Sequence, residues 1–174
     1  TDQNASYSSG SGTSTLAFSY TVQDGDTSSD LNYKATSSLA LNGATIKDSA
    51  GNSATLTLPT TGGSDSLAGN SALVIDTTAP TVQSVSSSTA DGTYTTGDVI
   101  TINVVFSEAV TVAGGTPTLT LETGSTDQNA SYSSGSGSTT LAFSYTVQDG
   151  DTASPLNYTD TSSLAHNGAT IQDL

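Results

Sequence analysis

Residues 97–110 read GDVITINVVFSEAV, and apolar side chains recur there at every second position. The apolar side of this extended stretch carries four residues: Ile100, Ile102, Val104 and Phe106. A period of two places these residues on one face of a strand, because successive side chains of a strand point to opposite faces. The stretch therefore predicts a β-strand with one buried face.

Similar short alternating segments, separated by Gly-rich turns, recur along the chain, and helical patterns are almost absent. Besides 99–107, strands are expected near 81–88, 116–122, 128–133 and 139–148, with a last one ending near residue 171. Two further candidates are Leu56–Leu58 and Leu73–Ile75. Many short strands with Gly-rich turns predict an all-β fold, an antiparallel β-sandwich.

The first 49 residues occur again later in the chain. Thr1–Ser49 aligns with Thr126–Leu174 at a shift of 125 places, and 40 of the 49 pairs are identical. A fixed period is typical of repeat proteins, and 125 residues is the size of an independent domain. We therefore interpret the chain as a window on a longer protein made of tandem 125-residue repeats.

The boundary between repeats is expected in IDTTAPTV, residues 75–82. Pro80 has a fixed φ and no backbone donor, which suits a stiff connector between domains. Residues 1–76 are then the C-terminal part of one repeat. Residues 77–174 are the N-terminal part of the next, whose last strands lie outside this window.

The charge of the chain restricts its partners. Two Lys, no Arg and 16 acidic residues give a net charge of −14. Such a polyanion repels nucleic acid and anionic lipid, but it suits divalent cations with oxygen ligands. No apolar run of about 18 residues exists, so no membrane span is expected in the window. The chain has no Cys to form a disulfide.

Four segments together, IDTTAP, GDVITINVVFSEAV, LAFSYTVQDGD and KDSAGN, resemble the bacterial Ig-like or cadherin-like repeats of very large surface and secreted proteins. Those proteins include adhesins and swarming-motility-type surface proteins. The resemblance covers essentially the whole window. It implies an Ig-like sandwich in a long extracellular stalk, often stiffened by calcium.

If the strands follow the usual Ig-like order, five carboxylates converge at the junction of two repeats. Glu108 would lie in the loop after strand 99–107, and Asp173 in the turn after the strand that ends near 171. These residues would face Asp76 and the QDGD turn that contains Asp24 and Asp26. Calcium takes six to eight oxygens, so we predict a calcium site there. The alternative is that these residues form ordinary turns.

In the same order, Asp91 and Asp98 belong to the loop between strands 81–88 and 99–107. That loop would meet Asp149 and Asp151 at the opposite end of the domain. A metal site at that end would be incomplete without the next repeat.

Catalysis is not expected. His166 is the single histidine, and the equivalent residue in the other copy is Leu41, so a function common to both copies cannot depend on it. Without Cys, and without a Ser–His pair present in both copies, a nucleophilic triad is unsupported. The acidic residues fall in loops, and no Trp is present to stack a sugar.

The sequence favours a structural repeat of an extracellular or cell-surface bacterial stalk, whose partners are neighbouring repeats. Other parts of such a protein would bind a host or cell-surface glycan or protein. One alternative is a fibre assembled by strand exchange between like chains. Another alternative is a calcium-dependent carbohydrate-binding module.

Overall fold

The computed structural model describes residues 2–174, and its regular secondary structure is almost entirely antiparallel β, which confirms the predicted all-β class. The chain divides into two compact units, Thr1–Thr78 and Ala79–Leu174, which we call unit 1 and unit 2. This division lies two residues after the boundary predicted between Asp76 and Thr77, and inside the segment 75–82.

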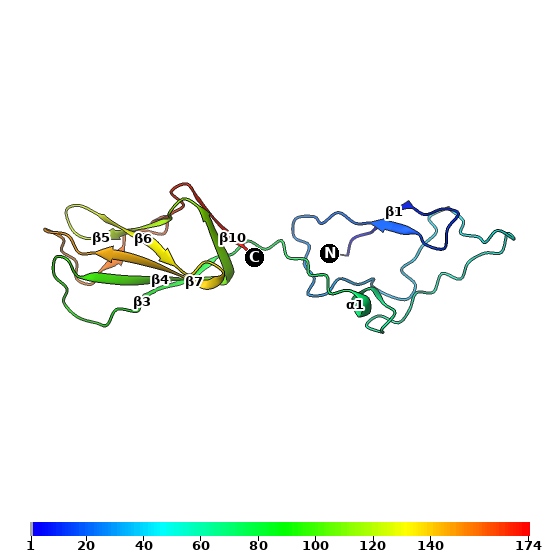
Figure 1. Ribbon diagram of the computed structural model, residues 1–174, viewed down its shortest axis with the longest axis horizontal. Helices are drawn as coiled ribbons and strands as arrows, with labels where there is room; N and C mark the ends of the chain where they lie inside the picture. Colours follow the sequence, from blue (N-terminus) through cyan, green and yellow to red (C-terminus); the bar gives the residue numbers. More distant parts are fainter. Residues whose placement is uncertain (1) are drawn as a thin grey trace. The chain divides into compact units, whose positions relative to one another are not determined.

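Unit 2 contains one antiparallel sheet (Figure 1). Its strands are β3 (Val82–Ser87), β4 (Val99–Gly114), β5 (Thr118–Glu122), β6 (Gln128–Ser134), β7 (Ser138–Thr146), β8 (Asn157–Tyr158), β9 (Leu164–Ala165) and β10 (Ala169–Asp173). The main path of the sheet runs β10-β4-β7-β6-β5-β8, while β3 pairs with β4 and β9 pairs with β5. The strands thus form one continuous sheet that curls around its apolar face.

Strand β4 holds three partners because it is long and irregular. Its first half pairs with β3 on one side and with β7 on the other, and Val104 lies opposite both Val85 and Leu141. The pairing with β7 shifts register between Val105 and Val110, and the second half of β4 then pairs with β10. Such an irregularity bends a strand, which allows the sheet to curl.

The core lies on the concave face of this sheet. Alternating residues of β4 are buried, and they pack with the buried residues of β5 and β7. The core consists of Ile100, Ile102, Val104, Phe106, Val110, Leu119, Leu121, Ala130, Leu141, Phe143 and Tyr145. The alternation seen in the sequence at residues 100–106 therefore marks the buried face correctly.

The strands predicted for unit 2 are confirmed within a few residues, with one correction. The strand predicted at 99–107 continues to Gly114, so Glu108 lies within β4 and not in a loop. The strand continues because Phe106 and Val110 are both buried and because β10 offers a backbone partner to residues 110–114. The polar residues Ser107 and Glu108 interrupt the alternation of apolar residues, and the sequence therefore predicted the end of the strand there.

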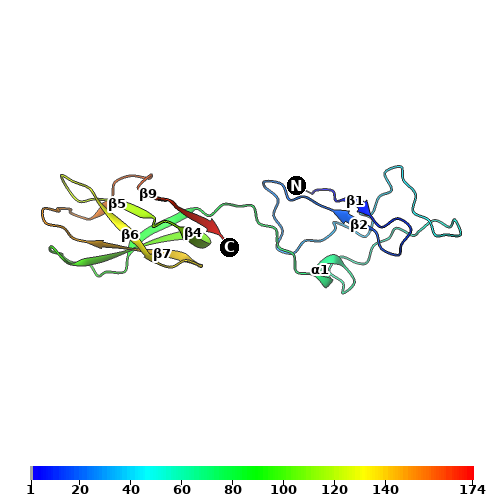
Figure 2. The same cartoon turned by 45° about the horizontal axis from the view of Figure 1, so that its top comes forward.

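Unit 1 has much less regular structure. Its elements are β1 (Ser6–Ser9), β2 (Ala17–Ser19) and the single-turn helix α1 (Leu67–Asn70), and Figure 2 shows the β1–β2 hairpin. Two isolated bridges, Ser28 with Ile75 and Lys47 with Ser53, connect the remaining segments. The segments Leu56–Leu58 and Leu73–Ile75 do not form the predicted strands. They make only isolated backbone contacts, from the Leu58 N–H to the Thr36 carbonyl and between residues 73–75 and 28–31.

Phe18 and Phe143 occupy equivalent positions of the two copies and provide a test of this core. Phe143 is fully buried, so Phe143→Ala should cost about 3–5 kcal/mol of unfolding free energy. Phe18 is 44% exposed, and Phe18→Ala should cost about 1 kcal/mol or less. Native-state hydrogen exchange measures the first effect at the amides of β4 and β7 and the second at the amides of β1 and β2. Equal losses of protection in the two variants would contradict the assignment of the core to unit 2.

Candidate functional site

The QDGD turn after β7, Gln148–Asp151, is closed by the side chain of its last residue. Asp151 Oδ2 accepts hydrogen bonds from the hydroxyl of Tyr145, at 2.5 Å, and from the backbone N–H of Gln148, at 2.7 Å. Its Oδ1 accepts a third from Gln128 Nε2, at 3.3 Å. The carboxylate thereby joins β6, β7 and the turn.

The first copy contains the same arrangement. Asp26 accepts hydrogen bonds from the hydroxyl of Tyr20, from the Gln23 N–H at 2.8 Å and from Gln3 Nε2 at 3.4 Å. Each of these residues lies 125 positions before its counterpart in unit 2. We call this arrangement of tyrosine, aspartate and glutamine the tyrosine–aspartate turn.

These hydrogen bonds change the pKa values of the groups involved. The hydrogen bond from Tyr145 is the main cause that lowers the pKa of Asp151, and the bond from Tyr20 does the same for Asp26. Burial, and then the hydrogen bond to Asp151, raise the pKa of Tyr145 to about 12. Each aspartate is therefore held as the charged acceptor and each tyrosine as the neutral donor.

The tyrosine–aspartate turn was missed by the sequence analysis, which interpreted Asp26 as a metal ligand. A signal was present, because a tyrosine precedes the last aspartate of QDGD by six residues in both copies. An aromatic residue on the buried face of a strand is ordinarily read as core only. Its hydroxyl needs a partner when the ring is buried, and the turn supplies that partner.

Three of the five predicted calcium ligands lie in unit 1. Asp24 and Asp76 are exposed, and Asp26 is buried. The Thr77 hydroxyl donates to the Asp26 carbonyl and accepts from the Gly25 N–H, both at 3.0 Å. The QDGD turn of unit 1 is thereby fastened to the residue that follows Asp76. Asp76 also accepts a hydrogen bond from the Thr78 N–H at 2.9 Å.

The other two predicted ligands lie in strands of unit 2. Glu108 is half-buried within β4, and Asp173 is the last residue of β10 and not part of a turn. The register places Asp173 opposite Val110, two residues after Glu108, so both acids belong to the same end of one strand pair. The β10 strand extends this far because β4 does not end at residue 107.

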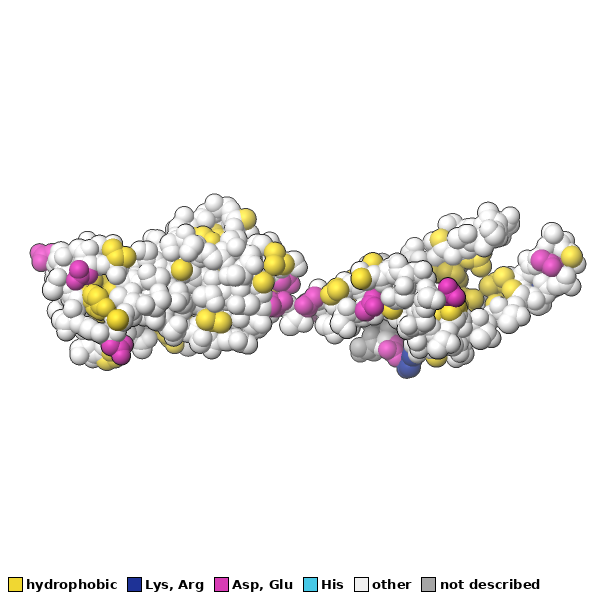
Figure 3. All heavy atoms as spheres, turned by 60° about the horizontal axis from the view of Figure 1, so that its bottom comes forward, with side chains coloured by type: hydrophobic (Ala, Val, Ile, Leu, Met, Phe, Trp, Pro, Cys, Tyr) yellow, Lys and Arg dark blue, Asp and Glu magenta, His cyan; other side chains and the backbone are white. Residues whose placement is uncertain are grey.

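Within residues 2–174, no three side chains of His, Cys, Asp or Glu lie together in an arrangement that could hold a metal. The predicted calcium site would draw its ligands from both units, and it stays a prediction. Figure 3 shows acidic side chains (magenta) on both units.

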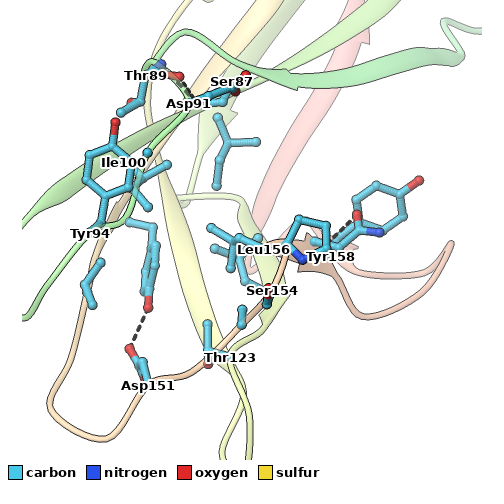
Figure 4. A pocket seen from close by; sticks show the side chains of 18 of the residues that line it. Ser87, Thr89, Asp91, Tyr94, Ile100, Thr123, Asp151, Ser154, Leu156 and Tyr158 are labelled. Atoms are coloured by element: carbon cyan, nitrogen blue, oxygen red, sulfur yellow. Dashed lines mark hydrogen bonds between the residues drawn. The ribbon is translucent and has the colours of Figure 1, made fainter.

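A second candidate site is a cavity of about 720 Å³ in unit 2. It lies between β3, the segment 89–94, the beginning of β4, β5 and the segment 151–158 (Figure 4). Ile100 and Leu156 contribute apolar surface, whereas Asp91 and Tyr94 contribute polar groups. The lining therefore combines apolar side chains with hydroxyl and carboxylate groups.

The loop before β4, residues 88–98, lies beside the end of β7. Asp91 and Asp151 both line it, and the Gly97 N–H donates to the Val147 carbonyl at 2.9 Å. In return, the Val147 N–H donates to the Asp98 carbonyl at 2.9 Å. The loop before β4 thus contacts the chain immediately before the second QDGD turn, at the end of the domain where it was predicted. A meeting of Asp91 and Asp98 with Asp149 and Asp151 stays a prediction.

Comparisons with known protein families, with curated proteins and with solved structures found no match to this chain. Among the described residues, no helix is long and apolar enough to cross a membrane.

The pKa shifts predict how the tyrosine–aspartate turn responds to pH. The pKa of Tyr145 is raised by folding, so its contribution to stability is complete below about pH 10 and is lost as pH rises to about 12. The pKa of Asp151 is lowered, so its contribution is complete above its unfolded value and is lost as pH falls through the folded value. Tyr145→Phe should therefore lower stability at neutral pH, remove the alkaline loss and reduce the acid loss, because Gln148 and Gln128 still donate hydrogen bonds to Asp151.

The measurement is the unfolding free energy of the wild-type chain minus that of Tyr145→Phe, followed from pH 2 to pH 12. Tyr158→Phe removes the same atom from an exposed tyrosine and serves as the control. A difference that stays constant between pH 8 and pH 12 would show that the Tyr145 hydroxyl does not support the fold.

Proposed function

We propose that this chain is part of a structural repeat protein, a long extracellular bacterial stalk in which each repeat acts as a spacer. The observation that carries the proposal is the recurrence of one local structure at a spacing of 125 residues. The same tyrosine–aspartate turn is present in both copies, and both hairpins have the same register, with Tyr7 opposite Phe18 and Tyr132 opposite Phe143. Faithful repetition of a framework without repetition of a reactive group is typical of a structural role.

The strand order supports an Ig-like interpretation of unit 2. Strands β3, β4, β7 and β6 are adjacent in that order, and β5 with β8 and β9 completes the curl. An Ig-like sandwich has the same succession, with the first, second, fifth and fourth strands in one layer and the third and sixth in the other. In this proposal one layer is formed by β3, β4, β7 and β6 and the other by β5, β8 and β9. The pairing of β5 with β6 joins the two layers along one edge.

The composition supports an exposed location. A surface with a net charge of −14 and few large apolar side chains keeps a repetitive protein soluble and separate from its neighbours. The absence of Cys means that the fold does not depend on the redox state of its compartment.

The stalk proposal predicts that the protein is displayed on the cell. An antibody raised against this chain should label intact cells of the organism that makes it, and a brief treatment of those cells with protease should remove the signal. An antibody against a cytosolic protein of the same cells is the control. Labelling that appears only after the cells are broken would overturn the proposal.

Calcium at the junction of repeats belongs to the same proposal and has its own test. A ligand that binds only the folded form stabilises it by about 2.7 kcal/mol at a hundredfold excess over Kd. Calcium should therefore raise the Tm of the chain, and Asp76→Ala or Glu108→Ala should abolish the rise. Asp127→Ala removes an exposed acid outside the predicted set and should keep it. An unchanged Tm in millimolar calcium would assign these carboxylates to the turns and strands alone.

A further inference from the structure

The two hairpins have the same internal geometry. The rings of Tyr7 and Phe18 meet edge to face with centroids 6.0 Å apart, and those of Tyr132 and Phe143 with centroids 6.1 Å apart. The Tyr7 hydroxyl accepts from the Ser11 N–H at 2.9 Å, as the Tyr132 hydroxyl accepts from the Ser136 N–H at 3.0 Å. The local sequence is therefore sufficient to form this hairpin.

The surroundings of the two hairpins differ. Phe143 is fully buried and Tyr132 is partly buried, whereas Phe18 is 44% exposed and Tyr7 is 51% exposed. Val22 is also exposed, while its counterpart Val147 packs against the core of unit 2. The β1–β2 hairpin thus presents to solvent the face that is covered in unit 2, and Figure 3 shows hydrophobic side chains open to view on unit 1. Large aromatic side chains exposed together are typical of an interaction surface.

In unit 2 the β6–β7 hairpin is flanked by two other strands, β4 and β5. Strand β4 pairs with β7, so that Ile102 lies opposite Phe143, and β5 pairs with β6, so that Leu119 lies opposite Ala130. In unit 1 the only ladder partner of β2 is β1 among the described residues. The outer edges of this hairpin therefore keep backbone groups that a further strand can pair with.

The rest of unit 1 also lacks strands that the equivalent segments of unit 2 form. Strands β8 and β9 pair with β5, and β10 pairs with β4. The equivalent segments of unit 1 are 32–33, 39–40 and 44–48, and none of them forms a strand. Residues 46–48 make backbone hydrogen bonds to 52–54 instead. Since 40 of the 49 pairs are identical, we attribute the missing strands to the absence of equivalents of β4 and β5.

We propose that the exposed face of the β1–β2 hairpin is the docking surface for an additional copy of the segment Ala79–Ser125, which would pair with it as β4 and β5 pair with β7 and β6. The segment would continue into Thr1 as Ser125 continues into Thr126. Together with residues 1–78 it makes one complete period of 125 residues. This inference depends on the comparison of the two units, and it requires neither a cell-surface location nor calcium.

An additional copy of the segment is favoured over exchange with unit 2 of another molecule. Strands β3–β5 of any chain already cover their own β6–β7 hairpin. Their transfer to a β1–β2 hairpin would expose Phe143 and Leu141 of the donor in order to bury Phe18 and Leu16 of the acceptor. Such an exchange has no net gain in buried apolar surface, and that burial is the main driving force for association.

The test is the full chain with a second copy of residues 79–125 joined before Thr1. Amide exchange of 17–20 should slow by about a hundredfold relative to the chain without the addition, because these amides enter a stable sheet. Exchange at 32–33, 39–40 and 44–48 should slow with it. Unchanged exchange in all four segments would overturn the proposal, provided that β4 and β7 of unit 2 keep their protection.

Two variants of the extended chain locate the docking face. Phe18→Asp puts a charge on the proposed face, at a position that is exposed in the unextended chain, and it should abolish the new protection. Ser19→Asp adds the same charge to the opposite side of β2, because neighbouring residues of a strand point to opposite faces, and it should keep the protection. Equal protection in the two variants would show that the added segment docks elsewhere and would overturn the proposal.

The free segment distinguishes docking within one chain from docking between chains. A separate polypeptide with the sequence 79–125, added to the unextended chain, should protect the same amides only at high concentration, because the covalent connection raises the effective concentration. Protection in the extended chain supports docking from the neighbouring segment. Docking that requires the free polypeptide, and is absent from the extended chain, would overturn the proposed connection to Thr1.

Discussion

The fold of unit 2 depends on one strand, β4, which pairs with β3, β7 and β10. A single strand can serve three partners only if it is long and if its pairing is interrupted, as the register shift between Val105 and Val110 allows. The same strand carries Ile102, Val104 and Val110 into the core. Hydrogen bonding and apolar burial are therefore concentrated in the same sixteen residues, and removal of this strand would leave the sheet without its centre.

A comparison of the two copies of the 49-residue sequence shows which structures depend on nearby residues and which depend on distant strands. Both copies form the hairpin and the tyrosine–aspartate turn, because these structures join residues close together in the sequence. Only the second copy forms β8, β9 and β10, because these strands need β4 and β5 as partners. Strand pairing fixes two segments at once, so a sequence with strand potential stays irregular where its partner is absent.

The tyrosine–aspartate turn changes the interpretation of the acidic residues. In a chain with two basic residues and 16 acidic ones, a carboxylate suggests a cation site. Asp26 and Asp151 accept hydrogen bonds from a tyrosine, a backbone N–H and a glutamine, so each of these carboxylates also has a role within the fold. Each carboxylate accepts hydrogen bonds from the strand and from the turn that follows it. These bonds stabilise the turn at the end of the strand.

The sequence by itself determined the all-β class, the positions of β3, β5, β6 and β7 to within a few residues, the sequence repeat at 125 positions and the apolar face at Ile100–Phe106. These features follow from periodicity and turn chemistry, which act over a few neighbouring residues. Only the tertiary structure decided that β4 continues through Glu108, that Asp173 lies in a strand, and that Leu56–Leu58 does not form a strand. It also decided that Phe143 is buried while the equivalent Phe18 is exposed. The reason is that strand ends and burial depend on partners distant in the sequence, which a local pattern does not contain.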